Sequence, residues 1–238
     1  MQSEISEVIQ DKHGHKVLLH LLSPYSKRYF SPELLNIMKP PVKMISKRIE
    51  PSEEGGEAQT VEMQLGISKK DDAVRRKEIF SGGLWDDVSN AILESAKEFL
   101  CKQYASDVVV EACIGGQGNF IESEFGSTVL DKLHQAIVDA ATAEDILTDY
   151  FGSRALRRII IASQNPDEES AKKFTRLLWQ KVLKGRCNEL KDSHAAKIVA
   201  ALIQCGCPEI VTVVKKELKG VKNPTTWAEK FAGKANKK

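Results

Sequence analysis

Apolar residues recur along most of the chain at the spacing of one face of an α-helix, three or four positions apart. The clearest stripes are Ile92, Leu93, Ala96, Phe99 and Leu100; Leu130, Leu133, Ile137, Val138 and Ala141; Phe174, Leu177, Leu178 and Val182; and Val211, Val214, Leu218 and Val221. Two β-branched runs, at 108–110 and 159–161, are also compatible with short buried strands, but each lies inside a longer helical pattern. We therefore interpret both runs as buried helix and predict an all-α fold.

Proline positions support helix starts at four places. Proline suits the first helical position because its missing N–H would have no partner there. Ser and Asn before such a proline are good N-caps, whereas Cys is a poor one. The four pairs of cap and proline are Ser31-Pro32, Asn165-Pro166, Cys207-Pro208 and Asn223-Pro224. Helices are therefore predicted to begin at all four prolines.

Residues 40–72 interrupt this pattern. They contain three prolines, an acidic run at 53–57 and a charged run at 69–72, and their large apolar residues are sparse and without a clear period. A segment of this composition buries too little apolar surface to join a core. We predict that it is a mobile insertion.

A weak internal repeat runs through the chain. In four copies an aromatic residue or His is followed by Gly or Ala, two polar or small residues and an apolar stretch. The small anchors are Gly14, Ala105, Gly152 and Ala195, separated by 91, 47 and 43 residues. Units of this length, with two or three helices, are typical of α-solenoids, in which stacked helices share one core. The anchor allows the repeated helix to approach its predecessor closely, although the first copy, ending at Leu22, is predicted to have no helix before it.

Composition limits the class of protein. The 238 residues carry 35 Lys and Arg against 33 Asp and Glu, a net charge of +2, which argues against a polycation and against an acidic disordered chain. No apolar run approaches the roughly 18 residues of a membrane span, so no membrane partner is expected. The charge is uneven, because residues 1–150 carry a net −9 and residues 151–238 a net +11. The second part is therefore the one expected to bind anions.

Two segments resemble a known family. The stretch Asp11-Lys12-His13-Gly14, continuing to Ser23-Pro24, is similar to the second helix of a Pumilio (Puf) repeat. Residues 5–24 together with 68–78 resemble the C-terminal half of the Puf-A-like branch, known as the CPL domain. The resemblance implies an Armadillo-like superhelix of Puf-type helical repeats. It also implies binding of RNA or DNA with little sequence preference, residence in the nucleolus or nucleus, and a part in ribosome biogenesis.

The repeated helices lack the side chains that read bases. In classical Puf repeats two or three side chains of one helix contact one base, and the resemblance places them first, second and fifth after the anchor. Here these triplets are His15/Lys16/Leu19, Ser106/Asp107/Val110, Ser153/Arg154/Arg157 and Ala196/Lys197/Ala200. None has Gln or Glu at the fifth position, whereas three of the four have Lys or Arg at the second. The set favours phosphate contact over base readout, with Asp107 as a repelling exception.

The densest basic cluster is formed by Arg154, Arg157 and Arg158, near a predicted helix start. Residues four apart share a helix face, so we predict a nucleic-acid contact there; the alternative is ion pairing with acids on the next helix. The basic residues at 172–176 and 215–216 fit ordinary solvated faces. The full set of predicted nucleic-acid-binding residues is His15, Lys16, Ser153, Arg154, Arg157, Arg158 and Lys197.

Other motifs do not indicate catalysis or a cofactor. His13 and His15 would face different sides of a helix, and no Cys or carboxylate completes a zinc set. Cys113 and Cys205 fall on apolar helix faces, as buried thiols do, and the odd total of five cysteines fits a reducing, intracellular compartment. The glycine-rich run at 115–118 lacks the strand and the Lys of a phosphate loop and is typical of a helix end. We therefore expect no catalytic residue, metal site or cofactor.

These observations give a three-part division and a function. Residues 1–39 are predicted to be a partial Puf-like repeat, 40–72 the mobile insertion, and 73–238 CPL-type helical repeats with C-terminal capping helices and a basic tail. The function predicted is that of a monomeric RNA-binding protein that recognises backbone and shape, with DNA as a further ligand. Its expected role is in pre-rRNA processing, ribosome biogenesis or translational regulation. The alternative is a scaffold that docks onto ribosome assembly factors or pre-ribosomal proteins.

Overall fold

The computed structural model describes residues 4–38, 42–48, 60–66 and 72–231. Contacts divide the chain into two compact units, one formed by residues 1–24 and 83–238 and the other by residues 25–82. Within the described ranges, no helix combines the length and the apolar character needed to cross a membrane.

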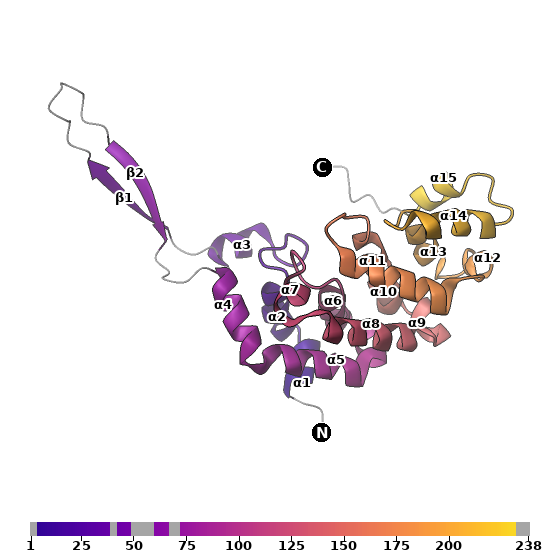
Figure 1. Cartoon of the computed structure of the whole chain (residues 1–238), viewed down its shortest axis with the longest axis horizontal. Coiled ribbons are helices and arrows are strands. Elements are labelled where there is room, and N and C mark those ends of the chain that lie inside the picture. Colours follow the sequence, from indigo (N-terminus) through magenta and orange to yellow (C-terminus); the bar gives the residue numbers. More distant parts are fainter. Residues whose placement is uncertain (1–3, 39–41, 49–59, 67–71, 232–238) are drawn as a thin grey trace. The chain divides into compact units, whose positions relative to one another are not determined.

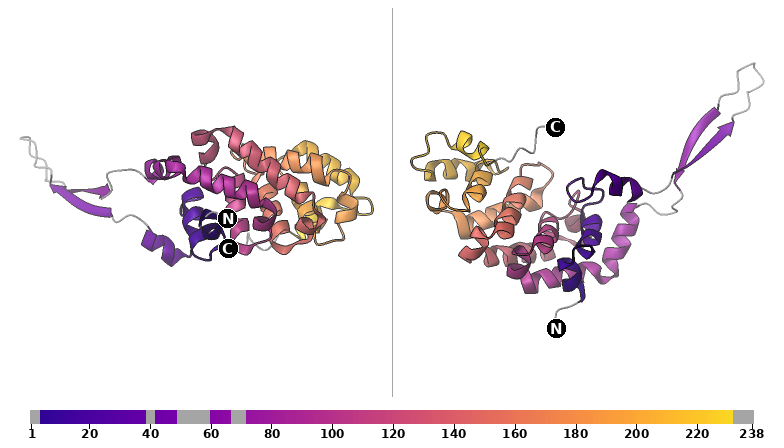
Figure 2. Two further views of the ribbon diagram at one scale, coloured as in Figure 1. Left: turned by 90° about the horizontal axis from the view of Figure 1, so that it is seen from below. Right: turned by 180° about the vertical axis from the view of Figure 1, so that it is seen from behind.

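The first unit is built from helices that follow one another in a stack, and colour, which marks chain position, changes steadily along it in every view (Figures 1 and 2). The predicted all-α superhelix is confirmed for this unit. A π-helical turn, η2 (Trp179–Leu183), extends the helix before it. The helices are α1 (Glu4–Gln10), α2 (Gly14–Leu22), α5 (Trp85–Leu100), α6 (Gln103–Cys113), α7 (Phe120–Phe125), α8 (Ser127–Ala141), α9 (Glu144–Thr148), α10 (Tyr150–Ala162), α11 (Glu169–Leu178), α12 (Cys187–Leu190), α13 (Ala196–Ile203), α14 (Pro208–Glu217) and α15 (Pro224–Glu229).

The internal repeat corresponds to one row of packed helices. The four anchors stand at or next to the starts of α2, α6, α10 and α13, and each of these helices packs on the next one in that order. In a second row, α5 packs on α8 and α8 on α11. The β-branched runs at 108–110 and 159–161 lie in α6 and α10, so their interpretation as helix is confirmed. Segments far apart in sequence thus share one core, as a solenoid requires.

Two glycine anchors allow neighbouring helices to touch backbone to backbone. A Cβ at Gly14 would lie 2.9 Å from the carbonyl oxygen of Val8 in α1, and a Cβ at Gly152 would lie 2.7 Å from that of Ile146 in α9. Real Cβ atoms do not approach other atoms below 3.0 Å, so a larger side chain would separate the helices. The contact of Gly14 with α1 also corrects one prediction, because a helix does precede the first copy.

The predicted helix end at 115–118 is confirmed and has a packing role. Gly115, Gly116 and Gly118 all have positive φ, which glycine adopts without the strain that a Cβ causes. The loop reaches the C-terminal end of α2, where the N–H of Gln117 donates to the carbonyl oxygen of Leu22 over 2.8 Å. The glycines thus end α6 and connect it to the first repeat.

Three of the four predicted helix starts are confirmed. α14 and α15 begin at Pro208 and Pro224, as α3 of the second unit begins at Pro32. The exception is Pro166, because α11 begins three residues later, at Glu169. The turn before it is held by side chains instead, since Asn165 accepts a hydrogen bond from the N–H of Asp167 over 3.2 Å.

The second unit contains a β-hairpin that the sequence analysis did not predict. The strands pair antiparallel, with Val42 opposite Gly66 and Arg48 opposite Thr60. The signal that was missed is the alternation of Val61, Met63 and Leu65 with polar residues, which is the period of a strand. The elements are α3 (Pro32–Met38), β1 (Val42–Arg48), β2 (Thr60–Gly66), α4 (Asp72–Ile79) and a π-helical turn, η1 (Phe80–Leu84), at its end.

Residues 40–72 were predicted to be mobile. Apart from the two strands, most of this segment, namely residues 49–59 and 67–71, lies outside the described residues. The mobility therefore stays a prediction. The same holds for the basic tail at 232–238.

Replacing Gly152 by Ala tests the close approach of α10 to α9. The new Cβ would lie 2.7 Å from the Ile146 oxygen, so the helices must separate and the free energy of unfolding should fall by about 1–3 kcal/mol. The matched control is Gly82→Ala, because a Cβ there meets nothing within 4 Å and should be neutral or stabilise by up to about 1 kcal/mol. Urea unfolding followed by circular dichroism measures both variants. If Gly152→Ala unfolded with the same free energy as the unmodified chain, the close approach of α10 to α9 would not depend on Gly152.

Candidate nucleic-acid interface

A polar groove lies between the first turns of α10 and α13. Its volume is about 390 Å³, and none of the described residues that line it is acidic. The structure brings four of the predicted nucleic-acid-binding residues together here, namely Ser153, Arg154, Arg157 and Lys197. We define the α10–α13 groove by all of its lining residues, which are Thr148, Tyr150, Ser153, Arg154, Arg157, His194 and Lys197.

Local hydrogen bonds fix the first turn of α10. The carboxylate of Asp149 accepts from the N–H of Phe151 over 2.8 Å and from the N–H of Gly152 over 2.7 Å. This is an N-cap, which satisfies donors that have no partner inside the helix. Because Gly152 also contacts α9, the turn that presents Arg154 to the groove is held from two sides.

The three cations of the groove differ in their surroundings. Arg154 and Lys197 are exposed, so each is free to reach a bound anion. Arg157 is half-buried, and its Nη2 donates to the carbonyl oxygen of Phe231 over 3.1 Å. Burial lowers the pKa of the Arg157 guanidinium, but an arginine keeps its proton in proteins because its ordinary pKa exceeds about 12. Arg157 therefore keeps its positive charge at neutral pH despite its partial burial.

Arg158 belongs to the packing between helices and not to the groove. It forms an ion pair with Asp107 and a second one with Glu111, at 3.3 Å, both on α6. Its side chain is only 10% exposed. The alternative of pairing with acids on a neighbouring helix thus holds for this arginine, and we remove it from the set of phosphate ligands. The same pair neutralises Asp107, the residue expected to repel phosphate.

His15 and Lys16 lie on α2, two helices away from α10 in the row. His15 is buried, its Nδ1 is 2.8 Å from the carbonyl oxygen of Asp11, and its ring stacks on Tyr104 with centroids 4.7 Å apart. Burial and stacking leave it unsuited to contact a ligand. Lys16 is partly exposed, so it remains a candidate for a separate phosphate contact.

Burial limits which side chains of the triplets could reach a base. All four residues at the first position are buried, namely His15, Ser106, Ser153 and Ala196. Three of the four at the fifth position are buried as well, namely Leu19, Val110 and Ala200. Side chains at the second position are exposed or partly exposed, and these are Lys16, Asp107, Arg154 and Lys197. Three of these four side chains, those of Lys16, Arg154 and Lys197, offer a ligand a positive charge, which carries no sequence information.

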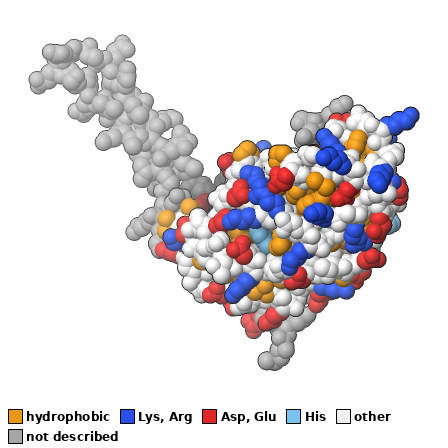
Figure 3. Space-filling model, turned by 45° about the vertical axis from the view of Figure 1, so that its right-hand side comes forward, with side chains coloured by type: hydrophobic (Ala, Val, Ile, Leu, Met, Phe, Trp, Pro, Cys, Tyr) orange, Lys and Arg blue, Asp and Glu red, His pale blue; other side chains and the backbone are white. Residues whose placement is uncertain are grey.

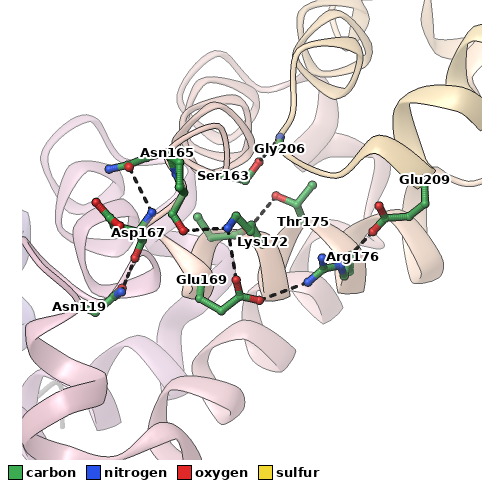
Figure 4. A network of polar contacts seen from close by, with 12 residues as sticks. Asn119, Ser163, Asn165, Asp167, Glu169, Lys172, Thr175, Arg176, Gly206 and Glu209 are labelled. Carbon is green, nitrogen blue, oxygen red and sulfur yellow. Dashed lines mark hydrogen bonds and ion pairs between the residues drawn. The ribbon is translucent and has the colours of Figure 1, made fainter.

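Several other basic residues of the C-terminal half form ion pairs, among them Lys172 and Arg176. On α11, Lys172 contacts Glu169 at 3.3 Å and donates to the carbonyl oxygen of Pro166 at 2.8 Å (Figure 4). Arg176 joins Glu169 at 3.4 Å and Glu209 of α14 at 3.0 Å. Basic and acidic side chains are likewise interspersed over the face in Figure 3. The net charge of this half therefore does not measure how many cations are available to a ligand.

Comparison with known proteins agrees with this architecture. Residues 57–170 match the family model of the CPL (NUC119) domain. The chain is 26% identical to Pumilio homolog 24 of Arabidopsis thaliana over 95% of its length, and 26% identical to Pumilio homolog 3 of Danio rerio over 92%. The crystal structure of human Puf-A shares its fold across 96% of the chain, with a TM-score of 0.64 and 21% sequence identity. The chain is thus similar to Puf-A-like proteins in sequence and in fold.

The chain spans only part of these relatives. It covers 39% of the Arabidopsis protein, 32% of the zebrafish protein and 42% of the human Puf-A chain. The match to the CPL domain begins inside the predicted insertion and ends in α11. The three matches support the predicted resemblance to Puf-A-like proteins, and the fold shared with human Puf-A confirms the predicted Puf-type superhelix.

Three lining residues of the α10–α13 groove were missed by the sequence analysis: Thr148, Tyr150 and His194. The signal was available for Tyr150, which stands four residues before Arg154 in α10, a spacing that places side chains on one helix face. Extending this basic face one turn toward the N-terminus would have found it. Thr148 and His194 lie outside α10 and α13, so only the fold brings them to the groove.

Truncating Arg158 tests its assignment to packing. Arg158→Ala leaves the acids of α6 without this cation, and Glu111 is only 5% exposed; an uncompensated buried charge costs about 3–5 kcal/mol. The control, Arg154→Ala, shortens an exposed arginine of the same helix and should change stability by less than about 0.5 kcal/mol. Chemical denaturation measures the free energy of unfolding. A loss below about 1 kcal/mol for Arg158→Ala would show that the pair behaves as a surface ion pair.

Proposed function

We propose that this chain binds RNA by holding its phosphate backbone in the α10–α13 groove, with little preference for sequence. The observation that carries the proposal is that Arg154, Arg157 and Lys197 converge on one groove that no described carboxylate lines. Like charges that line one groove together attract an anion, and none of the described residues that line it carries a negative charge. In complexes with nucleic acids, arginine and lysine side chains most often contact the phosphate groups of the backbone.

The absence of a sequence code follows from the buried triplets. A base edge is read by hydrogen bonds from positioned polar side chains, and the first and most of the fifth positions of the repeated helices are buried. Phosphate contacts alone do not distinguish RNA from DNA, because the 2′-OH is what marks RNA. DNA is therefore a further ligand in this proposal.

The cellular role proposed here rests on the Puf-A-like architecture. That resemblance supports action on pre-ribosomal RNA in the nucleolus, in ribosome biogenesis or rRNA processing, or a role in translational regulation. A shape- and charge-reading surface suits long structured RNAs, since it accepts any sequence with an accessible backbone. The proposal includes no catalytic step and no cofactor.

A protein-interaction scaffold is the second candidate. Val17 of α2 is 61% exposed and Ile37 of α3 is 79% exposed, and a protein partner would have to cover such side chains, although single exposed apolar residues are common and only a contiguous patch marks an interface. In that case ribosome assembly factors or pre-ribosomal proteins would be the ligands, and RNA contact would be incidental. The two candidates differ in what they predict for the purified chain: only phosphate binding in the groove requires an affinity for RNA that falls steeply with salt.

Charge reversal in the groove tests the proposed function. Arg154→Glu combined with Lys197→Glu removes two exposed cations, so RNA affinity should fall at least tenfold and the slope of log K against log salt should shrink by about 1.4. Fluorescence anisotropy with unrelated RNAs, repeated over a range of salt concentrations, measures both quantities. Circular dichroism checks that the helices remain.

The matched control is Lys215→Glu combined with Lys216→Glu on α14. Both lysines are exposed, and the change in net charge is the same. Affinity should then change little. Equal weakening by both pairs would show that overall charge, and not the groove, binds RNA, while a sharp preference for one short sequence would contradict recognition by phosphate alone.

A further inference from the structure

The ring of Tyr150 is exposed at the α10–α13 groove. Its exposed fraction is 66%, although it is a large side chain at the start of a well-ordered helix. Phe151 packs against it nearly perpendicular, with ring centroids 5.0 Å apart and planes at 86°, and so holds the ring from one side. A supported aromatic ring that remains largely exposed is the arrangement on which a nucleobase stacks.

The helix register places this ring beside the cations. Tyr150, Arg154 and Arg157 stand at i, i+4 and i+7, which is one face of α10. The ring and the first arginine are separated by four residues, or about 6 Å along the axis. Lys197 in the first turn of α13 and His194, two residues before that helix begins, line the same groove. A base on Tyr150 would thus have its own sugar-phosphate within reach of cations from both helices.

The size and chemistry of the groove favour a single strand over a duplex. At about 390 Å³ it is near the small end of the roughly 300–1,000 Å³ that ligand pockets span. A duplex keeps its bases stacked on each other, and only splayed or unpaired bases are available to an aromatic side chain. A duplex could use the cations of the groove, but it could not use Tyr150.

We infer that the α10–α13 groove takes single-stranded nucleic acid, with one base stacked on Tyr150 and the adjoining phosphate held by Arg154, Arg157 and Lys197. The inference rests on the proposed function, because it specifies which form of nucleic acid that surface prefers. Tyr150 supplies stacking, which any base can provide, so the preference for single strands arises without a sequence code.

The test compares Tyr150→Leu with Tyr150→Phe. Leu keeps an apolar side chain but has no aromatic face, whereas Phe keeps the face and loses the hydroxyl. Affinity for an unstructured single-stranded RNA should fall about 5- to 150-fold with Leu, the range for loss of one stacked base, and stay within about threefold with Phe. Affinity for the duplex of the same RNA with its complement should not change with either variant. The salt slope for the single strand should also stay the same, because no phosphate contact is lost.

The outcomes separate this inference from the proposed function. If the unmodified chain binds RNA with a steep salt slope but Tyr150→Leu binds single strands equally well, the stacking inference is wrong and phosphate binding stands. If Tyr150→Leu weakens duplex and single strand equally, Tyr150 acts on the groove as a whole and the single-strand preference is overturned. If the unmodified chain shows no salt-dependent binding, the proposed function fails first. Circular dichroism of each variant confirms that a loss of affinity is not a loss of fold.

Discussion

The close contact between the start of α10 and the end of α9 is the constraint on which the groove depends. Gly152 lies so near the carbonyl oxygen of Ile146 that no Cβ fits between them. The Asp149 carboxylate caps the same turn, so the position and the rotation of α10 are both fixed where the helix begins. Tyr150 lies in this first turn and Arg154 directly follows it. Backbone packing therefore fixes the direction in which the Cα–Cβ bonds of Tyr150 and Arg154 leave the helix.

The row of repeated helices divides side chains into those that hold the solenoid together and those that face a ligand. Arg158 and Arg157 are neighbours in sequence, yet one pairs with Asp107 on α6 and the other lines the groove. A buried ion pair of this kind holds two helices in register, while its net contribution to stability is small compared with the cost of removing one partner. Much of the positive charge in the second half of the chain, as on α11, is neutralised by nearby acids. The net charge of this half therefore does not locate the α10–α13 groove.

The predictions succeeded where the signal is local and failed where the partner is distant. Helix periodicity and the small anchors are visible within a few residues, and they gave the repeated helices and the row they form. The pairing of Arg158 with Asp107 spans 51 residues of sequence, so only the packing of α10 on α6 shows it. The hairpin was missed for a different reason. The alternation of apolar and polar residues in β2 is short, and the prolines and charges around it were given more weight.

Within the groove the cations have different tasks, which follow from how each is held. Arg154 and Lys197 are exposed, so fixing either on a phosphate costs rotamer entropy of up to about 2 kcal/mol. Arg157 is already oriented by its hydrogen bond to Phe231. A guanidinium has five N–H donors, so Arg157 can keep this bond and still donate to a phosphate oxygen with little further ordering. In the proposed binding mode, directional recognition of the backbone would therefore fall mainly to Arg157, while the exposed pair would supply the long-range attraction that brings a nucleic acid to the groove and weakens with salt.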